Sequence, residues 1–125
     1  GAMCIEQKLT EPLADGYEIS CHLVPMGRDL TLCVSGGNGP HIGSAVMSVA
    51  RPSLTGQGVG VTSSVLNGMG HKDEYEARKF AEALAKKYNC TAVCTCGIHI
   101  DGITEAQLKA VSECCDRLLA QLMDQ

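Results

Sequence analysis

Aromatic residues are scarce in this sequence, which has no tryptophan, a single phenylalanine (Phe80) and an aromatic share of 3%. This scarcity excludes a ligand platform built on tryptophan, and it leaves the core to aliphatic residues, alanine, methionine and cysteine. Long apolar runs are also missing, because none approaches the ~20 residues that a membrane-spanning helix needs. We therefore expect no membrane partner.

Positive charge is not in excess either. The chain has 10 lysines and arginines against 14 aspartates and glutamates, for a net charge of -4. Its basic residues are scattered along the sequence, so nothing provides the basic surface that attracts nucleic acid. The opening Gly1-Ala2-Met3 is typical of a scar left by tag removal and not of a signal peptide. We therefore predict an expression-tag scar at residues 1–3, a single domain over residues 4–125, and a cytoplasmic location.

The eight cysteines do not form a C-x-x-C pair anywhere in the chain. Most of them lie in apolar periodic segments, where a free thiol behaves as a small hydrophobic side chain. We predict reduced, mostly structural thiols in a reducing compartment. Cys94 and Cys96 lie at alternate positions of a predicted strand and therefore on one face, where a soft-metal site or a strained redox bridge is the alternative.

Four strands are predicted before the first helix, because alternating or apolar segments are separated by turn residues. They cover residues 17–24, 30–34, 44–50 and 59–66. A short fifth strand, Thr91 to Cys96, has a composition that suggests burial on both faces, and residues 97–102 are predicted to form a loop after it. The first two strands are expected to form a hairpin across the turn at Pro25 to Asp29.

Two helices follow from apolar residues at helical spacing. The first, roughly His71 to Tyr88, buries a stripe that includes Phe80 and Leu84. The second follows a capping box formed by Thr104 and Gln107. The predicted fold class is therefore α+β, a mainly antiparallel sheet with two helices on one face. The uncovered sheet face predicts pairing with a second copy, hence a homodimer.

Polar residues gather in four short motifs at strand ends and in loops, where binding sites are commonly built. The motifs are Pro40-His41-Ile42-Gly43, Arg51-Pro52-Ser53, Gly70-His71-Lys72-Asp73 and Gly97-Ile98-His99-Ile100-Asp101. The third precedes a helix, where free backbone N–H groups and a lysine can hold a phosphate, although it lacks the Walker A spacing. A Gly-rich turn with a solvated lysine is the alternative.

Two of the other motifs also have a functional and a structural interpretation. Arg51 is directed by the proline after it, so that its guanidinium is available to grip a phosphate or to form a surface ion pair. His99 and Asp101 lie two residues apart, and three roles are open for them. His99 can bind a metal while Asp101 holds its ring, the two can transfer a proton, or His99 is simply exposed beside an aspartate that caps the turn. The sequence has no G-x-S-x-G elbow for nucleophilic catalysis.

In this order and at these separations, the four motifs resemble the LpdD-like family of prenylated flavin chaperones, small proteins associated with UbiD-type decarboxylases. The similarity runs from about Tyr17 to the C-terminal helix. The resemblance implies a fold similar to the proteasome-assembly chaperones and a dimer. It also implies a non-catalytic role, in which the protein binds reduced prenylated flavin mononucleotide and delivers it to an apo UbiD-type decarboxylase as its client.

The cofactor contacts expected from the resemblance fall on the same four motifs. Phosphate contacts are expected from the motifs that contain Arg51 and Lys72. Contacts to the ring are expected from the motifs that contain His41 and His99, together with Met47 and Met69. The cofactor-binding residues predicted in this way are His41, Arg51, Ser53, Gly70, His71, Lys72, His99 and Asp101. The alternatives are a protein-assembly chaperone without a small ligand, and a metal-dependent enzyme that uses the histidines and Asp101.

Overall fold

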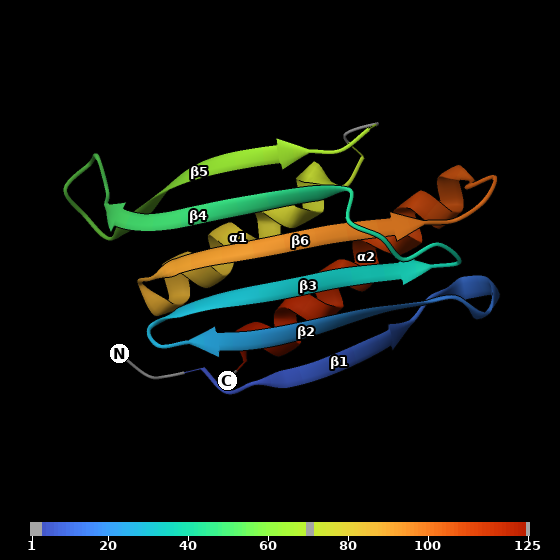
Figure 1. Ribbon diagram of the computed structural model, residues 1–125, viewed down its shortest axis with the longest axis horizontal. Coiled ribbons are helices and arrows are strands. Elements are labelled where there is room, and N and C mark those ends of the chain that lie inside the picture. Colours follow the sequence, from blue (N-terminus) through green and yellow to red (C-terminus); the bar gives the residue numbers. More distant parts are fainter. Residues whose placement is uncertain (1–3, 70–71, 125) are drawn as a thin grey trace.

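The computed structural model describes residues 4–69 and 72–124 and contains six strands and two α-helices (Figure 1). In chain order the strands and helices are β1 (Gln7–Pro12), β2 (Glu18–Met26), β3 (Asp29–Gly37), β4 (Ser44–Pro52), β5 (Val59–Asn67), α1 (Glu74–Tyr88), β6 (Thr91–His99) and α2 (Glu105–Met123). A short 3-10 turn, Ala14–Gly16, joins β1 to β2. The predicted hairpin is present as β2 and β3, with Gly27 in its turn at a φ of 62°.

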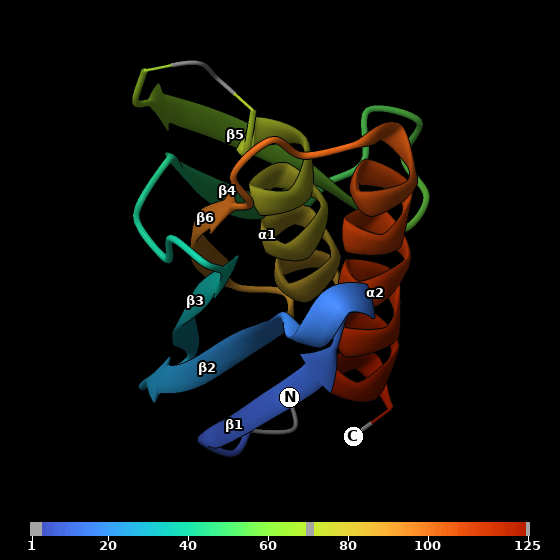
Figure 2. The same cartoon turned by 90° about the vertical axis from the view of Figure 1, so that its right-hand side faces the viewer.

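The six strands form one sheet in the order β1-β2-β3-β6-β4-β5. The β3–β6 pair is parallel and the other pairs are antiparallel. Both helices lie on the same side of this sheet (Figure 2). The predicted α+β fold class, a mainly antiparallel sheet with two helices on one face, is therefore confirmed.

The core lies between the helices and the covered face of the sheet. The predicted inner stripe of α1 is buried, with Phe80 and Leu84 both 0% exposed, and α2 buries Leu118 and Leu122 against the same layer. The capping box at the start of α2 is present, because the Thr104 hydroxyl accepts from the Gln107 N–H and the Gln107 side chain accepts from the Thr104 N–H. Neither helix combines the length and the apolar character that a membrane span requires.

Strand β1 was not predicted, so five strands precede α1 in place of the expected four. Leu9 is the only large apolar residue in the segment Gln7–Pro12, too weak an alternation to indicate a strand. Tertiary contacts stabilise it instead. β1 pairs with β2 at one edge of the sheet, and Glu11 accepts hydrogen bonds from Arg117 at 3.0 Å and Gln121 at 3.1 Å on α2.

Two boundaries and the burial of β6 also differ from the predictions. β6 continues through His99, so the first three residues of the predicted 97–102 loop belong to the strand. Only one face of β6 is fully buried: Ala92, Cys94 and Cys96 point into the core, whereas Thr91, Val93 and Thr95 are half-buried. Helix α1 begins at Glu74, after the Asp73 N-cap, whereas the sequence placed its start near His71, a residue outside the described ranges.

All eight cysteines are free, and six of them are buried. Cys94 and Cys96 lie on the same face of β6, as predicted, but that face packs into the core. Burial raises the pKa of both thiols well above the ordinary value and that of the Cys21 thiol to about 11. The prediction of mostly structural thiols is confirmed, and Cys33 is the exposed exception.

The face of the sheet opposite the helices, here called the open face, is divided by residue type. Over β4 and β5 it presents Met47, Val49 and Leu66, whose exposed fractions are 43%, 38% and 76%. Over β1, β2 and β3 it presents a lysine, a histidine, a cysteine and hydroxyl side chains. The open face therefore has an apolar part and a polar part, side by side on one sheet.

Candidate functional site

A loop crosses over the end of β6 on the open face. Because β6 lies between β3 and β4, the connection from β3 to β4, residues 38–43, has to pass over β6; this segment is the crossing loop (Figure 1). Backbone hydrogen bonds fix it to the strand: Asn38 N–H donates to the His99 carbonyl at 2.9 Å, and Gly43 N–H donates to the Cys96 carbonyl at 2.9 Å. The loop is thereby held at a defined place above β6.

Two glycines permit this close crossing. A Cβ atom on Gly97 would lie 1.8 Å from the His41 carbonyl oxygen, a distance at which the loop would have to move. Gly37, at the end of β3, has a φ of 79°, and a Cβ there would lie 2.0 Å from the His99 carbonyl oxygen. Glycine at these positions brings the crossing loop into contact with the backbone of β6.

The crossing places two histidines beside each other. The rings of His41, from the loop, and His99, from the end of β6, are 6.4 Å apart between centroids and nearly perpendicular. Asp101 accepts from His99 Nε2 at 2.9 Å and from the Asn38 side-chain amide at 2.7 Å. These two hydrogen bonds, with that from His99 the stronger influence, lower the pKa of the Asp101 carboxyl.

Asp73, the residue before α1, completes this group and is 8% exposed. Its Oδ1 accepts the Ile98 N–H at 3.1 Å, and its Oδ2 lies 3.6 Å from His41 Nε2. His41 Nδ1 is 2.8 Å from the Gly39 carbonyl, which only accepts, so Nδ1 donates. We call His41, His99, Asp101, Asp73 and Asn38 the histidine cluster.

Asp73 was not among the predicted site residues. An acidic residue at the start of a helix favours the helix dipole, and Asp73 is the N-cap of α1, but its side chain makes no capping hydrogen bond. The pairing of β4 with β6 ends at Ser44, opposite Cys96, so β4 provides no backbone acceptor for the Ile98 N–H. The Asp73 carboxylate accepts that hydrogen bond instead, a role that sequence alone does not reveal.

Of the predicted site residues, His41, His99 and Asp101 lie together in the histidine cluster. Lys72 is exposed and lies next to Asp73 in sequence, where it lines a small cavity of about 70 Å³ under the ends of α1 and α2. Met69 is fully exposed in the connection from β5 to α1, and Met47 lies on the open face. Gly70 and His71 fall outside the described residues.

Arg51 and Ser53 are not brought to the histidine cluster. β4 starts just after the crossing loop and ends at Pro52, so Arg51 lies about 20 Å from the loop, given a rise of ~3.3 Å per residue. Arg51 crosses the open face of β5, where its Nε donates to the Thr62 hydroxyl at 3.0 Å. Ser53 hydrogen-bonds Thr55 at 2.9 Å in the loop beyond β4. The structure therefore separates the Arg51-Pro52-Ser53 motif from the motifs that contain His41 and His99.

A family model described as the prenylated flavin chaperone LpdD-like domain matches residues 13–125. This chain belongs to that family. It is 32% identical over 108 residues to Protein LpdD of Lactiplantibacillus plantarum, an alignment that covers 86% of this chain and 76% of that protein. The LpdD-like family match starts just after β1 and includes all four predicted motifs.

The fold also has a counterpart among solved structures. A chain from a novel chaperone complex for yeast 20S proteasome assembly superimposes with a TM-score of 0.59, covering 94% of this chain and 98% of that chain. Sequence identity is 12%, so this match establishes the fold and nothing about ligands. The predicted similarity to proteasome-assembly chaperones is confirmed at the level of the fold.

Metal-ligating side chains do not gather in the described part of this LpdD-like domain. Within residues 4–69 and 72–124, no three histidine, cysteine, aspartate or glutamate side chains approach closely enough to hold an ion. The two histidines of the cluster each face a carboxylate through one ring nitrogen. His41 has both ring nitrogens engaged, by Gly39 and Asp73, whereas among the described residues His99 Nδ1 has no partner and can hydrogen-bond a polar ligand.

Asp73 provides a direct test of this geometry. Asp73→Ala leaves the Ile98 N–H without its acceptor, so we expect the free energy of unfolding to fall by about 1–3 kcal/mol. Asp73→Asn keeps an acceptor oxygen for that N–H and should retain most of the stability. Urea unfolding of both variants measures the difference. Equal losses in the two variants would contradict the role of the Ile98 hydrogen bond.

Proposed function

We propose that this protein binds reduced prenylated flavin mononucleotide and delivers it, without a catalytic step of its own, to an apo UbiD-type decarboxylase in the cytoplasm. The observation that carries the proposal is the family match over residues 13–125, whose description names the prenylated flavin. A carrier has to hold its ligand and release it again. An open site at the end of an interior strand suits that requirement better than a closed cavity.

The histidine cluster is the proposed contact for the ring system of the flavin. The side chains of His41 and His99 are 44% and 41% exposed, so each ring presents a surface to a ligand. His41 is held through both ring nitrogens and His99 through Nε2. Ile42 and Met69, 72% and 103% exposed, supply apolar surface near the same end of β6, because Gly68 N–H donates to the Gly43 carbonyl. Polar contacts beside apolar walls are the usual composition of a cofactor site.

We also propose that the protein is a homodimer that uses the apolar part of the open face. Met47, Val49 and Leu66 are large hydrophobic side chains exposed on one flat surface, a combination that marks interaction sites. If a second copy covers these side chains, the polar part of the open face lies at the periphery of the dimer interface. The decarboxylase can then reach the ligand at that periphery.

An anaerobic titration tests the ligand. We expect reduced prenylated flavin mononucleotide to be retained through size-exclusion chromatography, whereas reduced flavin mononucleotide is retained less. Light scattering on the same fractions gives the mass of the dimer, and elemental analysis gives the metal content. Adding an apo-decarboxylase to the loaded protein should transfer the cofactor, measured as decarboxylase activity.

The variants His41→Ala and His99→Ala should weaken retention of the prenylated cofactor, because each removes a ring of the histidine cluster. Arg51→Ala is the comparison, since Arg51 lies at the far end of β4. No retention by the unaltered protein would favour an assembly chaperone without a small ligand. A stoichiometric transition metal in the fractions would favour a metal-dependent enzyme.

A further inference from the structure

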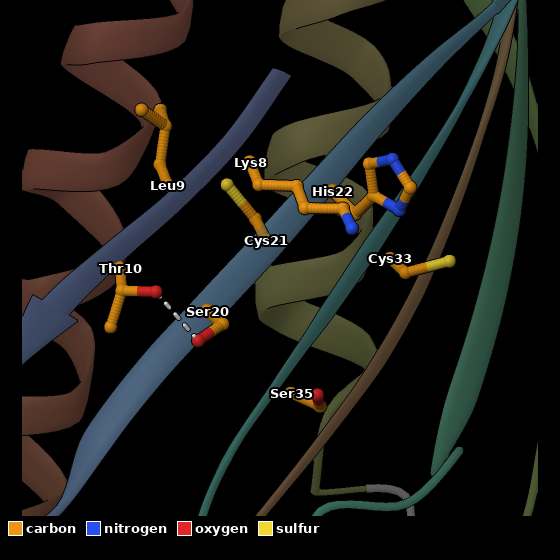
Figure 3. Close-up of a pocket in the computed structure, with 8 residues that line it drawn as sticks. All are labelled: Lys8, Leu9, Thr10, Ser20, Cys21, His22, Cys33 and Ser35. Atoms are coloured by element: carbon orange, nitrogen blue, oxygen red, sulfur yellow. Dashed lines mark hydrogen bonds between the residues drawn. The ribbon is translucent and has the colours of Figure 1, made fainter. Parts of the chain in front are cut away.

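The polar part of the open face contains a hollow of about 220 Å³ (Figure 3). It is formed by β1, β2 and β3, and we call it the β1–β3 hollow. The side chains that line it on the solvent side are mostly small and polar, with one lysine and one histidine. They are Lys8, Thr10, Ser20, His22, Cys33 and Ser35.

Strand register explains why these residues converge. Lys8 pairs with His22, and His22 pairs with Cys33, so the three occupy one row across the strands. Thr10 pairs with Ser20, and Ser20 pairs with Ser35, which gives a second row of hydroxyl groups two residues along. The hollow is therefore a place where an ammonium group, an imidazole and three hydroxyls face the same space.

The Lys8 and His22 side chains of the hollow are available to a ligand. Among residues 4–69 and 72–124, the Lys8 ammonium group takes part in no hydrogen bond or ion pair. Figure 3 shows its side chain extending from β1 over β2, beside His22. His22 Nε2 is 3.2 Å from the Glu6 carboxylate, and these side chains are 37% and 61% exposed. A solvent-exposed pair of this kind is weak, so a phosphate can replace the Glu6 carboxylate as the partner of His22.

These groups fit a phosphate monoester. Such a group carries about -1.5 to -2 charges at neutral pH and three acceptor oxygens. Lysine offers three donors, and hydroxyl groups turn to donate where an acceptor lies. On the β4–β5 side of the open face Met47 and Leu66 are exposed, and the Arg51 guanidinium already donates to the Thr62 hydroxyl. The Lys8 ammonium, unpaired among the described residues, therefore makes the hollow the favourable place for an anion on this side of the sheet.

The hollow also lies at a useful distance from the histidine cluster. The hydroxyl row continues from Ser35 to its β6 partner Gly97, and Gly97 lies directly under His41. Ser20 is two strands away from Gly97, about 10 Å at the usual spacing of ~4.8 Å. The ribityl chain of a flavin nucleotide, with its five carbons, spans a distance of the same order between ring and phosphate.

We infer that the β1–β3 hollow binds the terminal phosphate of the flavin nucleotide, with Lys8 as its principal cation, while the ring lies at the histidine cluster. This inference rests on the proposed function for the identity of the ring, but the phosphate site stands on the hollow itself. It assigns the phosphate to residues other than the predicted Arg51, which lies at the opposite end of β4.

The test separates the phosphate from the flavin by using ribitol 5-phosphate, with ribitol as its neutral counterpart. In NMR titrations of the labelled protein, the phosphate ester should shift the amide signals of Thr10, Ser20, His22 and Ser35, and ribitol should not. Lys8→Ala should weaken this binding by roughly tenfold or more, since a hydrogen bond to a charged group is lost. Lys86→Ala, which removes the same charge from the exposed surface of α1, should bind as the unaltered protein does.

Each result decides the phosphate site independently of the carrier function. Signal shifts that centre on Arg51 or Lys72, or a Lys8→Ala variant that binds as before, would overturn the inference. If ribitol 5-phosphate binds in the hollow but the prenylated cofactor is not retained, the phosphate site stands and the proposed function fails. If the cofactor is retained equally by the unaltered protein and by Lys8→Ala, the function stands and the phosphate site fails.

Discussion

Replacing Leu84 with alanine should lower the free energy of unfolding by about 2–5 kcal/mol, the range for deleting a buried leucine side chain. Leu84 is 0% exposed on the inner face of α1, in the same core cluster as Phe80 and Leu118. The surrounding sheet and helices are held by their own backbone hydrogen bonds, so they cannot readily move to fill the cavity that Leu84→Ala leaves. Urea unfolding monitored by circular dichroism measures the loss.

Leu108→Ala is the matched control for this stability measurement. Leu108 is a leucine in the first turns of α2, but it is 52% exposed, so removing its side chain leaves a smaller cavity. We expect a distinctly smaller loss for Leu108→Ala than for Leu84→Ala. A loss near zero for Leu84→Ala would show that α1 packs on the sheet through another face.

The helices were predictable because their signals are local. Phe80 and Leu84 repeat at helical spacing, and Thr104 with Gln107 forms a capping box within four residues, so no knowledge of distant contacts was needed. β1 lacks such a signal, because Leu9 is its only large apolar side chain and its neighbours on β2 and α2 stabilise it. Edge strands that depend on tertiary contacts are therefore the part of this fold that sequence patterns do not reveal.

The histidine cluster illustrates the same limit at the site. His41, His99 and Asp101 were recognisable as polar residues in loop-like motifs, but their proximity follows from the strand order, in which β6 separates β3 from β4. Arg51 was predicted to join them because the sequence does not reveal this strand order. Asp73 looked like an ordinary acidic residue at a helix start until its hydrogen bond to Ile98 on β6 was seen.

Lys8 and His22 had no motif to distinguish them, because they lie on separate strands and become neighbours only through register. A sequence pattern identifies residues that are close along the chain or that belong to a known motif. It does not identify a row of side chains drawn from β1, β2 and β3. The β1–β3 hollow therefore needed the structure.

The second large effect is expected at Gly97, where alanine should both destabilise the protein and displace the crossing loop. The added Cβ would lie 1.8 Å from the His41 carbonyl oxygen and 2.3 Å from its carbonyl carbon, and backbone atoms do not yield as a flexible side chain does. Overpacking of this kind costs about 1–3 kcal/mol. Because His41 moves with the loop, its contact with the His99 ring should be lost, and retention of the prenylated cofactor should fall with it.

Gly102→Ala separates this displacement from a general loss of stability. Gly102 has a φ of 61°, so alanine is strained there by about 1–2 kcal/mol, but apart from its chain neighbours no described residue has an atom within 4 Å of the added Cβ. The two variants should therefore lose similar stability in urea, while only Gly97→Ala loses the nuclear Overhauser contact between the rings of His41 and His99. If that contact and the cofactor affinity survive in Gly97→Ala, the crossing loop adapts without moving His41. The position of the histidine cluster would then not depend on the glycine beneath it.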